Sequence, residues 1–229
     1  MISAFSNVPV KKKIASVLFP QYSLVLDQVN GNAAFRKWVK QIPDSVPVFP
    51  DRPEFEAALF EKYVGMGPIN YVEFGVHTGG SITRWSTRNK HPDSRFYGFD
   101  SFVGLPEDWT PTVNKAYFNL DGKMPVINDN RVTLIKGWFQ ETLPGFLSTF
   151  QSNKPLVIHN DSDLHSSSLY ALTNMDRFIT KGTLIIFDDF NSALHEFRAW
   201  HDYCRAFMRS GRPVALTAKY AEQVAFLMD

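Results

Sequence analysis

The chain has 229 residues, and its 24 Lys and Arg against 23 Asp and Glu give a net charge of +1. This balance excludes strong electrostatic attraction to nucleic acid or to an anionic membrane, so we expect a small-molecule partner and no nucleic acid or membrane. Hydrophobic residues make up 44% and charged residues 21%, which excludes disordered, collagen-like and coiled-coil proteins. The sequence leaves open whether the protein forms a homo-oligomer.

Cysteine usage and apolar runs bear on the compartment. Cys204 is the only cysteine, so no intramolecular disulfide can form, and we predict a cytoplasmic protein. A basic and apolar run at 11–19 imitates a targeting signal, but Pro20 interrupts it and no small-residue cleavage site follows. No window approaches the roughly 18 consecutive apolar residues of a membrane span.

Residues 1–50 differ in character from the rest of the chain. They hold five prolines and show no periodicity to which we can assign a regular element. We predict that 1–50 form an N-terminal extension that shapes an acceptor pocket or a subunit contact, and that 51–229 form the main domain. A helix is expected to begin near Pro53, to continue through Phe55 and Leu59, and to end at Gly65.

Apolar and β-branched runs then recur along the chain, separated by amphipathic stretches with a helical period. The predicted strands are 70–75, 95–100, 131–136, 155–160 and 183–189, followed by 213–220 and 222–228. Strands that alternate with helices indicate an α/β fold with a parallel sheet covered on both faces. The last two runs lie too close together for a helical crossover and are expected to form an antiparallel pair at the sheet edge.

Ligands of open α/β sheets bind outside the carboxyl ends of the strands, so the residues that follow each strand are the candidates. The first strand leads into GVHTGGS at 75–81, whose glycines allow tight turns and whose Ser81 could cap the next helix. His77 stands where the dinucleotide fingerprint G-x-G-x-x-G has its second glycine. The segment is either a ligand loop or a simple strand-to-helix turn.

The second strand ends in Asp100, where a carboxylate can accept both hydroxyl groups of a ribose. A single aspartate at this place also serves as a helix cap or turn residue. The loop at 101–109 either wraps over a ligand or packs as an ordinary loop.

Acidic residues follow the next strands. Asp161 and Asp163 come after 155–160, and Asp188 and Asp189 close the run 183–189. If these strands are parallel neighbours, the carboxylates converge, and their repulsion requires protons or a bound cation, for which a hard divalent ion is suited. The alternative is that each aspartate caps the helix after its own strand.

Five motifs in this order resemble the macrocin O-methyltransferase family of S-adenosylmethionine-dependent enzymes. They are YVEFGVHTGGS (71–81), FYGFDSFVGLPE (96–107), LIKGWFQETLP (134–144), NDSDLHSSS (160–168) and IIFDD (185–189). The resemblance implies a class I methyltransferase fold, which is Rossmann-like, with a mostly parallel seven-stranded sheet, an antiparallel edge strand and helices on both faces. It also implies methylation of a hydroxyl group on a sugar or another small natural product, with S-adenosylmethionine as cofactor and a divalent metal, usually Mg²⁺.

Residue roles follow from the resemblance position by position. The methionine and sulfonium end of the cofactor would be surrounded by Glu73, Phe74, Gly75, Thr78, Gly79, Gly80 and Ser81. Asp100 would hold the ribose beside Ser101 and Phe102, and the adenine would lie near Gly137, Trp138 and Phe139. The metal would bind Asp161, Asp188 and Asp189, whose separations of 27 and 28 positions are similar to those of catechol-type methyltransferases.

The chemistry of methyl transfer suggests which groups move the proton. A sulfonium is already a strong electrophile, so the protein has to align the acceptor oxygen and help to remove its proton. Asp161 could be both ligand and base, and the resemblance also implies that it lies near the cofactor. His165 and His159 are further candidate bases, although a structural role is commoner for histidine. Two alternatives remain at this stage, a nucleotide-dependent oxidoreductase and a non-catalytic cofactor-binding module.

Overall fold

The computed structural model describes residues 9–110, 112–218 and 220–229. The chain divides into two compact units, Met1–Gln41 and Ile42–Asp229. The second unit thus begins before the position predicted from the sequence. The suggested role of residues 1–50 at an acceptor pocket or a subunit contact stays a prediction.

The first unit holds one long helix, α1 (Pro9–Val39). No regular element is predicted here from the sequence, because the prolines of this segment disfavour a continuous helix. The interval between Pro20 and Pro43 is free of proline, however, and its Leu, Ala, Lys and Arg residues favour a helix. Several apolar side chains of this interval are exposed, among them Leu24 and Val29.

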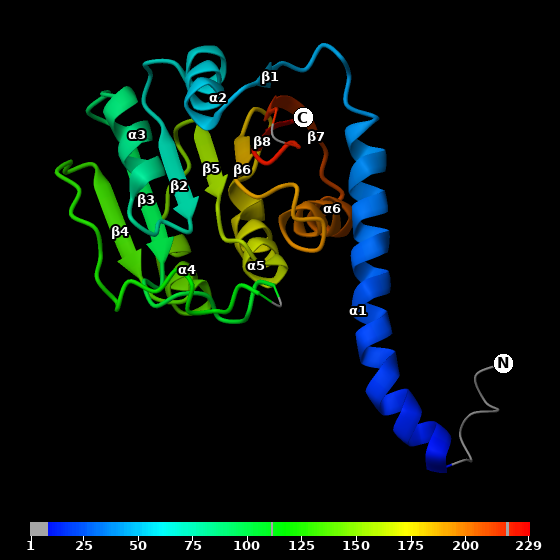
Figure 1. Cartoon of the computed structure of the whole chain (residues 1–229). Coiled ribbons are helices and arrows are strands. Elements are labelled where there is room, and N and C mark those ends of the chain that lie inside the picture. Colours follow the sequence, from blue (N-terminus) through cyan, green and yellow to red (C-terminus); the bar gives the residue numbers. More distant parts are fainter. Residues whose placement is uncertain (1–8, 111, 219) are drawn as a thin grey trace. The chain divides into compact units, whose positions relative to one another are not determined.

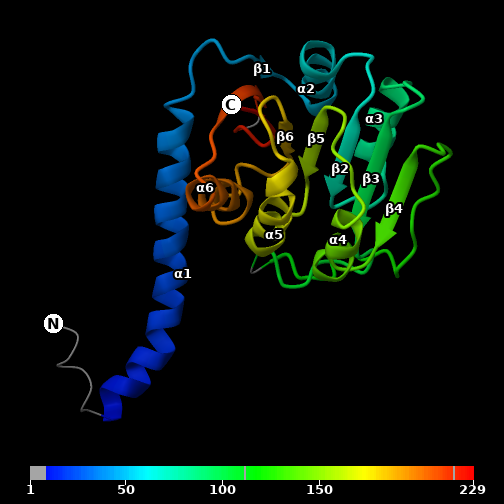
Figure 2. The same cartoon turned by 180° about the vertical axis from the view of Figure 1, so that it is seen from behind.

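The second unit is built on one sheet with the strand order β1-β7-β8-β6-β5-β2-β3-β4 in the described residues (Figures 1 and 2). Its strands are β1 (Val48–Phe49), β2 (Asn70–Phe74), β3 (Arg95–Asp100), β4 (Val132–Lys136), β5 (Leu156–Asn160), β6 (Leu184–Phe187), β7 (Gly211–Thr217) and β8 (Val224–Met228). The neighbours β6-β5-β2-β3-β4 all pair in parallel.

Seven of these strands lie where the sequence predicts them, but the sheet differs in two details. It has eight strands in the described residues, because the two-residue β1 adds to β7 at Leu216 and Thr217. The antiparallel strand β8 is not at the edge, since it lies between β7 and β6 and pairs antiparallel with both. A strand as short as β1, between Pro47 and Pro50, has no periodicity that a sequence pattern could reveal.

Helices cover both faces of the sheet (Figure 1). On one face lie α2 (Arg52–Leu59), the π-helical turn η2 (Phe60–Val64) and α3 (Gly80–Arg88). Here Trp85 of α3 stacks on Tyr71 of β2, with ring centroids 5.3 Å apart, within a buried cluster that includes Phe55 and Leu59 of α2. The predicted end of the first helix at Gly65 agrees with its positive φ of 66°.

The opposite face packs against a second group of helices. These are α4 (Phe139–Leu147), α5 (His165–Met175) with the 3₁₀ turn η3 (Asp176–Phe178), and α6 (Glu196–Ala206). Phe139 contacts Phe74 edge to face at 5.3 Å, and Trp200 contacts Phe187 at 5.7 Å. Because alternate strand residues pack on opposite faces, the burial of both faces fixes the register of the central strands.

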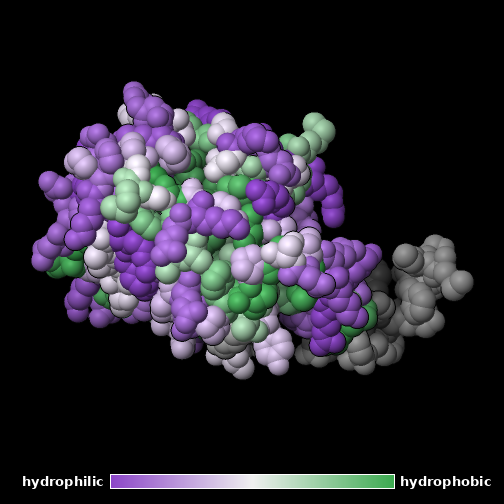
Figure 3. Space-filling model, turned by 90° about the horizontal axis from the view of Figure 1, so that it is seen from above, coloured by the Kyte–Doolittle hydropathy of each residue, from purple (hydrophilic) through white to green (hydrophobic). Residues whose placement is uncertain are grey.

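The outer surface agrees with the balanced composition. Figure 3 shows hydrophilic residues interspersed with hydrophobic ones over the face seen from above. None of the described helices combines the length and the apolar character needed to cross a membrane.

Candidate active site

The candidate site lies where β2, β5 and β6 end. Two hydrogen bonds continue the ladder past these ends, from Asp161 N to Phe74 O at 2.8 Å and from Asp188 N to Asn160 O at 3.1 Å. Parallel pairing therefore brings the residues after each strand together, as the sequence analysis expects.

Gly75 is required by the close approach of two backbones. Its φ is +92°, and a Cβ at this position would lie 1.7 Å from the carbonyl oxygen of Asp161. Only glycine adopts this conformation without strain and leaves room for the neighbouring chain. The glycine thus lets the loop after β2 lie directly beside the loop after β5.

A cavity opens at this edge and joins the nucleoside residues predicted from the sequence to the acidic ones. Its lining includes the predicted residues Gly75, Asp100, Ser101, Trp138, Phe139, Asp161, Asp188 and Asp189. Residues without a predicted role there are His77, Gly104, Leu105, Pro106, Phe118, Gln140, Ser162, Asp163 and Ser167. The loop at 101–109 therefore contributes to the cavity wall.

Asp100 organises the loops at the nucleoside end of the cavity. Its Oδ2 accepts hydrogen bonds from the backbone N–H groups of Val76 (2.9 Å) and His77 (2.7 Å), and its Oδ1 accepts one from Phe102 N at 2.6 Å. A carboxylate has about four acceptor positions, so these bonds leave capacity for a ligand hydroxyl group. Asp100 therefore shapes the loop and also faces the cavity.

The glycine-rich segment makes a turn whose cap differs from the predicted one. Gly79, with φ +79°, is the N-cap of α3, and Ser81 lies within the helix, where its hydroxyl accepts a hydrogen bond from Arg84 at 3.2 Å. Thr78, Gly79, Gly80 and Ser81 are not among the residues that line the cavity. Their assignment to the cofactor stays a prediction.

The predicted adenine segment is held next to Asp100. Gly137 N donates to Asp100 O at 2.9 Å, and Gly137 has a φ of +140°. Trp138 and Phe139 follow and line the cavity, whereas Phe74 and Phe102 are fully buried and do not. Aromatic residues thus form the cavity wall on this side.

Four aspartates of the cavity lining lie close to one another. Carboxylate oxygens of Asp161, Asp163 and Asp189 lie within 4.8 Å of one another, and so do donor atoms of His159, Asp161 and Asp188. Burial and the neighbouring carboxylates raise the pKa of Asp163 to about 8 and that of Asp189 to about 6, and they raise the pKa of Asp161 well above its usual value. At neutral pH Asp163 is therefore mostly protonated unless a cation compensates its charge, whereas Asp189 is mostly ionised.

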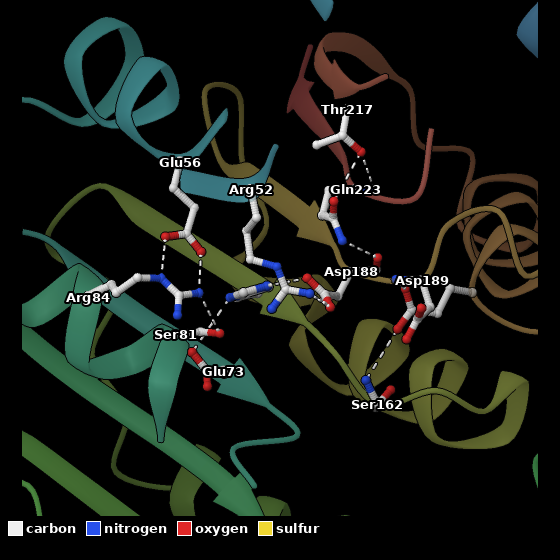
Figure 4. Close-up of polar contacts among 12 residues, drawn as sticks. Arg52, Glu56, Glu73, Ser81, Arg84, Ser162, Asp188, Asp189, Thr217 and Gln223 are labelled. Carbon is white, nitrogen blue, oxygen red and sulfur yellow. Dashed lines mark hydrogen bonds and ion pairs between the residues drawn. The ribbon is translucent and has the colours of Figure 1, made fainter. Parts of the chain in front are cut away.

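Asp188 differs from the other three aspartates because two cationic side chains of the protein, Arg52 and His159, lie next to its carboxylate. Arg52, the first residue of α2, forms an ion pair with Asp188 Oδ2 (Figure 4). His159 Nε2 lies 3.8 Å from Asp188 Oδ1. Burial raises the pKa of Asp188, but the nearby His159 imidazolium and the Arg52 charge outweigh it, so that the pKa is lowered.

His159 belongs to a buried polar group beneath α2. Tyr71 donates its hydroxyl proton to Glu73 Oε2 at 2.5 Å and lies 2.7 Å from His159 Nδ1. Burial alone would lower the pKa of His159, but the nearby carboxylates of Asp188 and Glu73 raise it to about 10. A protonated imidazole has no free nitrogen with which to accept a proton, so His159 is unsuited to act as a base.

Glu73 and His165 lie apart from the cavity lining. Glu73 is 1% exposed and contacts Tyr71 and His159, although the resemblance places it beside the cofactor. His165 Nε2 lies 3.1 Å from Asp202 Oδ2 on α6. Both positions favour a structural role for these two side chains.

The sequence assigns no role at this site to Arg52 and Glu56, and it does not select Asp163 as a metal ligand. Arg52 comes from a helix that precedes every recognised motif, and the one signal available is that Arg52 and Glu56 lie one turn apart on a helix with apolar neighbours. Glu56 is itself buried and accepts two hydrogen bonds from Arg84 (Figure 4). Asp163 is visible in the sequence, but the spacing to Asp188 and Asp189 favours Asp161 over Asp163 as the metal ligand.

The donor set fits the divalent ion that the resemblance implies. Hard cations such as Mg²⁺ prefer carboxylate oxygens, and the cluster offers several within reach of one another. Asp188 Oδ1 is buried and has no hydrogen-bond partner. Burial and the neighbouring carboxylates both disfavour the ionised forms of Asp161 and Asp163, an effect that a bound cation would offset.

Comparison with known proteins decides the family. A family model described as a methyltransferase domain matches residues 72–190, about half of the chain, from β2 to just beyond Asp189. The chain belongs to this family. The matched range contains the glycine-rich loop, Asp100 and all four aspartates of the cluster, so the methyltransferase expectation is confirmed at the level of the domain.

Two curated relatives are similar over part of their length. The chain is 29% identical over 161 residues to 8-demethyl-8-(2,3-dimethoxy-alpha-L-rhamnosyl)-tetracenomycin-C 4'-O-methyltransferase of Streptomyces olivaceus, covering 57% of this chain and 58% of that protein. It is 27% identical to demethyldecarbamoylnovobiocin O-methyltransferase of Streptomyces niveus, covering 59% of this chain and 60% of that one. The match thus spans about three fifths of these curated relatives.

A solved methyltransferase structure has the same fold as this chain. The crystal structure of the calicheamicin methyltransferase CalS11 superposes with a TM-score of 0.57 at 17% identity, covering 99% of this chain and 89% of that chain. This likeness confirms a methyltransferase-like α/β fold.

Proposed function

We propose that the protein transfers a methyl group from S-adenosylmethionine to a hydroxyl group of a sugar or another small natural product. The observation that carries this proposal is the single cavity that has Asp100 and Trp138 in one part of its wall and Asp161 and Asp189 in another. The printed names of the two curated relatives, both O-methyltransferases and one acting on a rhamnosyl compound, support the class of acceptor. The narrower assignment to the macrocin family and the cytoplasmic location belong to the same proposal.

The nucleoside would bind at the end of the cavity that the sequence analysis assigns to it. Asp100 would accept the ribose hydroxyl groups with the oxygen capacity that its backbone bonds leave free, and Trp138 and Phe139 would contact the adenine. The positively charged sulfonium would then lie toward the aspartates, whose negative charge favours it. This orientation leaves the methyl group facing the acidic end of the cavity.

The acceptor oxygen would be aligned and deprotonated at that acidic end. Asp161 is our candidate for the base, because it lines the cavity and lies among the carboxylates that would hold a cation beside the acceptor hydroxyl group. Asp161, Asp188 and Asp189, with Asp163 beside them, would hold a divalent ion, which when bound would lower the pKa of the acceptor hydroxyl group. Proper alignment alone can supply about 7–11 kcal/mol of the barrier reduction.

The proposal is tested by binding and by turnover. Calorimetric titration should show that the chain binds S-adenosylhomocysteine and does not bind NADH. Incubation with methyl-labelled S-adenosylmethionine and a panel of glycosylated acceptors should transfer label to at least one hydroxyl group, and a chelator should slow the transfer. Binding of NADH in place of S-adenosylhomocysteine would refute the proposal and favour an oxidoreductase.

A further inference from the structure

Glu196, the first residue of α6, is a buried carboxylate without an assigned role. Its side chain is completely buried. Its Oε1 accepts a hydrogen bond from the backbone N–H of Ser162 at 3.2 Å, and its Oε2 accepts one from the backbone N–H of Asp189 at 3.0 Å. Ser162 stands between Asp161 and Asp163, so both donors belong to the chain segments that carry the acidic cluster.

The two donors come from loops that leave different strands. Ser162 lies in the loop after β5 and Asp189 in the loop after β6, and Figure 4 shows both residues near each other at the ends of their strands. The last backbone bond of this strand pair runs from Asp188 N to Asn160 O. Beyond that bond, the Glu196 carboxylate connects the two loops where the ladder ends.

The geometry needs two acceptor oxygens on one side chain. A carboxylate provides them, whereas the amide of glutamine has the same shape but offers one acceptor and one NH₂ group. With glutamine at this position, the NH₂ group would face a backbone N–H donor. One of the two loops would then lose its connection.

A buried acid here has an electrostatic cost. Burial, and then the charges of Asp189 and Asp161, disfavour the ionised form of Glu196 and raise its pKa, against the favourable hydrogen bond from Asp189 N. A fifth carboxylate next to the four aspartates of the cluster also strengthens the need for a compensating cation. A neutral side chain would avoid this cost but could not hold both loops.

We propose that Glu196 is a positioning residue that fixes the separation between the loop of Asp161 and Asp163 and the loop of Asp188 and Asp189. It thereby sets the spacing of the oxygens that face a divalent ion and an acceptor hydroxyl group. The proposal rests on the function proposed above in one respect, namely that these aspartates act together. It assigns Glu196 no contact with the substrate.

The test compares Glu196→Gln with the matched control Glu61→Gln, which removes the same charge at an exposed site. Binding of Mn²⁺ is measured by electron paramagnetic resonance, binding of S-adenosylhomocysteine by calorimetry, and exchange of the Ser162 and Asp189 amides by NMR. We expect Glu196→Gln to weaken Mn²⁺ binding about 10- to 100-fold, as loss of an outer-shell partner does. Faster exchange of at least one of the two amides and an unchanged affinity for S-adenosylhomocysteine should accompany it.

Kinetics separate positioning from general destabilisation. With an accepted substrate, Glu196→Gln should lower kcat and raise the Mn²⁺ concentration required, while the KM for S-adenosylmethionine stays the same. Unchanged Mn²⁺ affinity together with unchanged amide exchange would overturn the proposal. If the native chain binds S-adenosylhomocysteine but no Mn²⁺, the metal part of the proposed function fails, and the amide exchange and kcat of Glu196→Gln still decide the role of Glu196.

Discussion

Single residues at the strand ends determine how closely the loops of the site approach. Gly75 allows the loop after β2 to touch the backbone of Asp161, and Asp100 gathers three backbone N–H groups from two loops. Both residues fulfil these roles through contacts with the protein backbone alone. The site is therefore held mainly by backbone contacts that particular side chains permit or complete.

Replacing Gly75 by alanine should severely destabilise the protein. A positive φ costs a non-glycine residue roughly 1–2 kcal/mol, and the clash of Cβ with the Asp161 carbonyl adds overpacking of about 1–3 kcal/mol. Urea denaturation should show a loss of about 3 kcal/mol. The matched control is Gly145→Ala in α4, where a Cβ meets no atom within 4 Å and where stability should rise by up to about 1 kcal/mol. Equal effects of the two substitutions would contradict this account.

Asp161→Asn should abolish turnover and spare the cofactor. Loss of a general base typically costs about 10²- to 10⁴-fold in rate. Calorimetry should give the same affinity for S-adenosylhomocysteine as in the native chain, because Asp100 and Trp138 are untouched. Asp44→Asn, at an exposed position, provides the control and should keep full activity. Retained turnover in Asp161→Asn would move the base to another residue.

Asp188→Asn should also abolish turnover, and in addition it should destabilise the fold. The substitution removes the carboxylate that faces both Arg52 and His159, and it leaves these cations without their partner. We therefore expect a lower melting temperature for Asp188→Asn than for Asp161→Asn. Equal melting temperatures would show that the Arg52 ion pair contributes little to stability.

The sequence predicts the residues that follow strands better than those that come from helices. Asp100, Asp161 and Asp189 can be placed at one edge because strand ends in a parallel sheet meet there. Arg52 and Glu196 cannot be placed in this way. Each is the first residue of a helix, and its direction toward the aspartates is set by how that helix packs on the sheet.

At the scale of elements, an ion pair joins the end of α5 to α6 and the loop that follows. Asp176 in η3 accepts hydrogen bonds from Tyr203 of α6 at 2.8 Å and from Arg209 at 2.8 and 3.0 Å. The Arg209 hydrogen bonds, with a further contribution from Tyr203, lower the pKa of Asp176 below 3.8. This contact lies on the sheet face opposite to α2 and α3, away from the acidic cluster.

The lowered pKa gives a pH-dependent contribution to stability. A carboxyl group with a depressed folded-state pKa stabilises the fold fully above its unfolded pKa, and the contribution is lost as the pH falls through the folded value. Asp176→Asn should therefore cost about 1 kcal/mol of unfolding free energy at neutral pH, since the pair is partly solvated. The difference from the native chain should shrink in urea titrations below pH 3.8. A difference that grows in acid would contradict the assignment.

The predictability of each element depends on its length and pattern. Strands such as β2 and β6 are short apolar runs between turn residues, and their positions follow from the sequence. The place of β8 between β6 and β7 does not follow, because two antiparallel runs close in sequence can join a sheet in either order. The length of α1 is not predicted either, because prolines usually interrupt a helix and here they flank residues that favour one.

At the scale of the whole molecule, the residues proposed for cofactor and metal all lie in the unit Ile42–Asp229. We therefore expect the chain from residue 42 onward to fold and to bind S-adenosylhomocysteine with the affinity of the full chain. Calorimetry on both proteins, with a thermal melt of each, checks this expectation. Weaker binding by the shortened protein would assign Met1–Gln41 a part in the cofactor site.

The most direct measurement is a crystal structure of the chain with S-adenosylhomocysteine and Mn²⁺, recorded with anomalous scattering from manganese. The account predicts the ribose at Asp100, the adenine near Trp138, and an anomalous peak among Asp161 and its acidic neighbours. A nucleoside bound elsewhere, or a cavity that stays empty at saturating ligand, would contradict it.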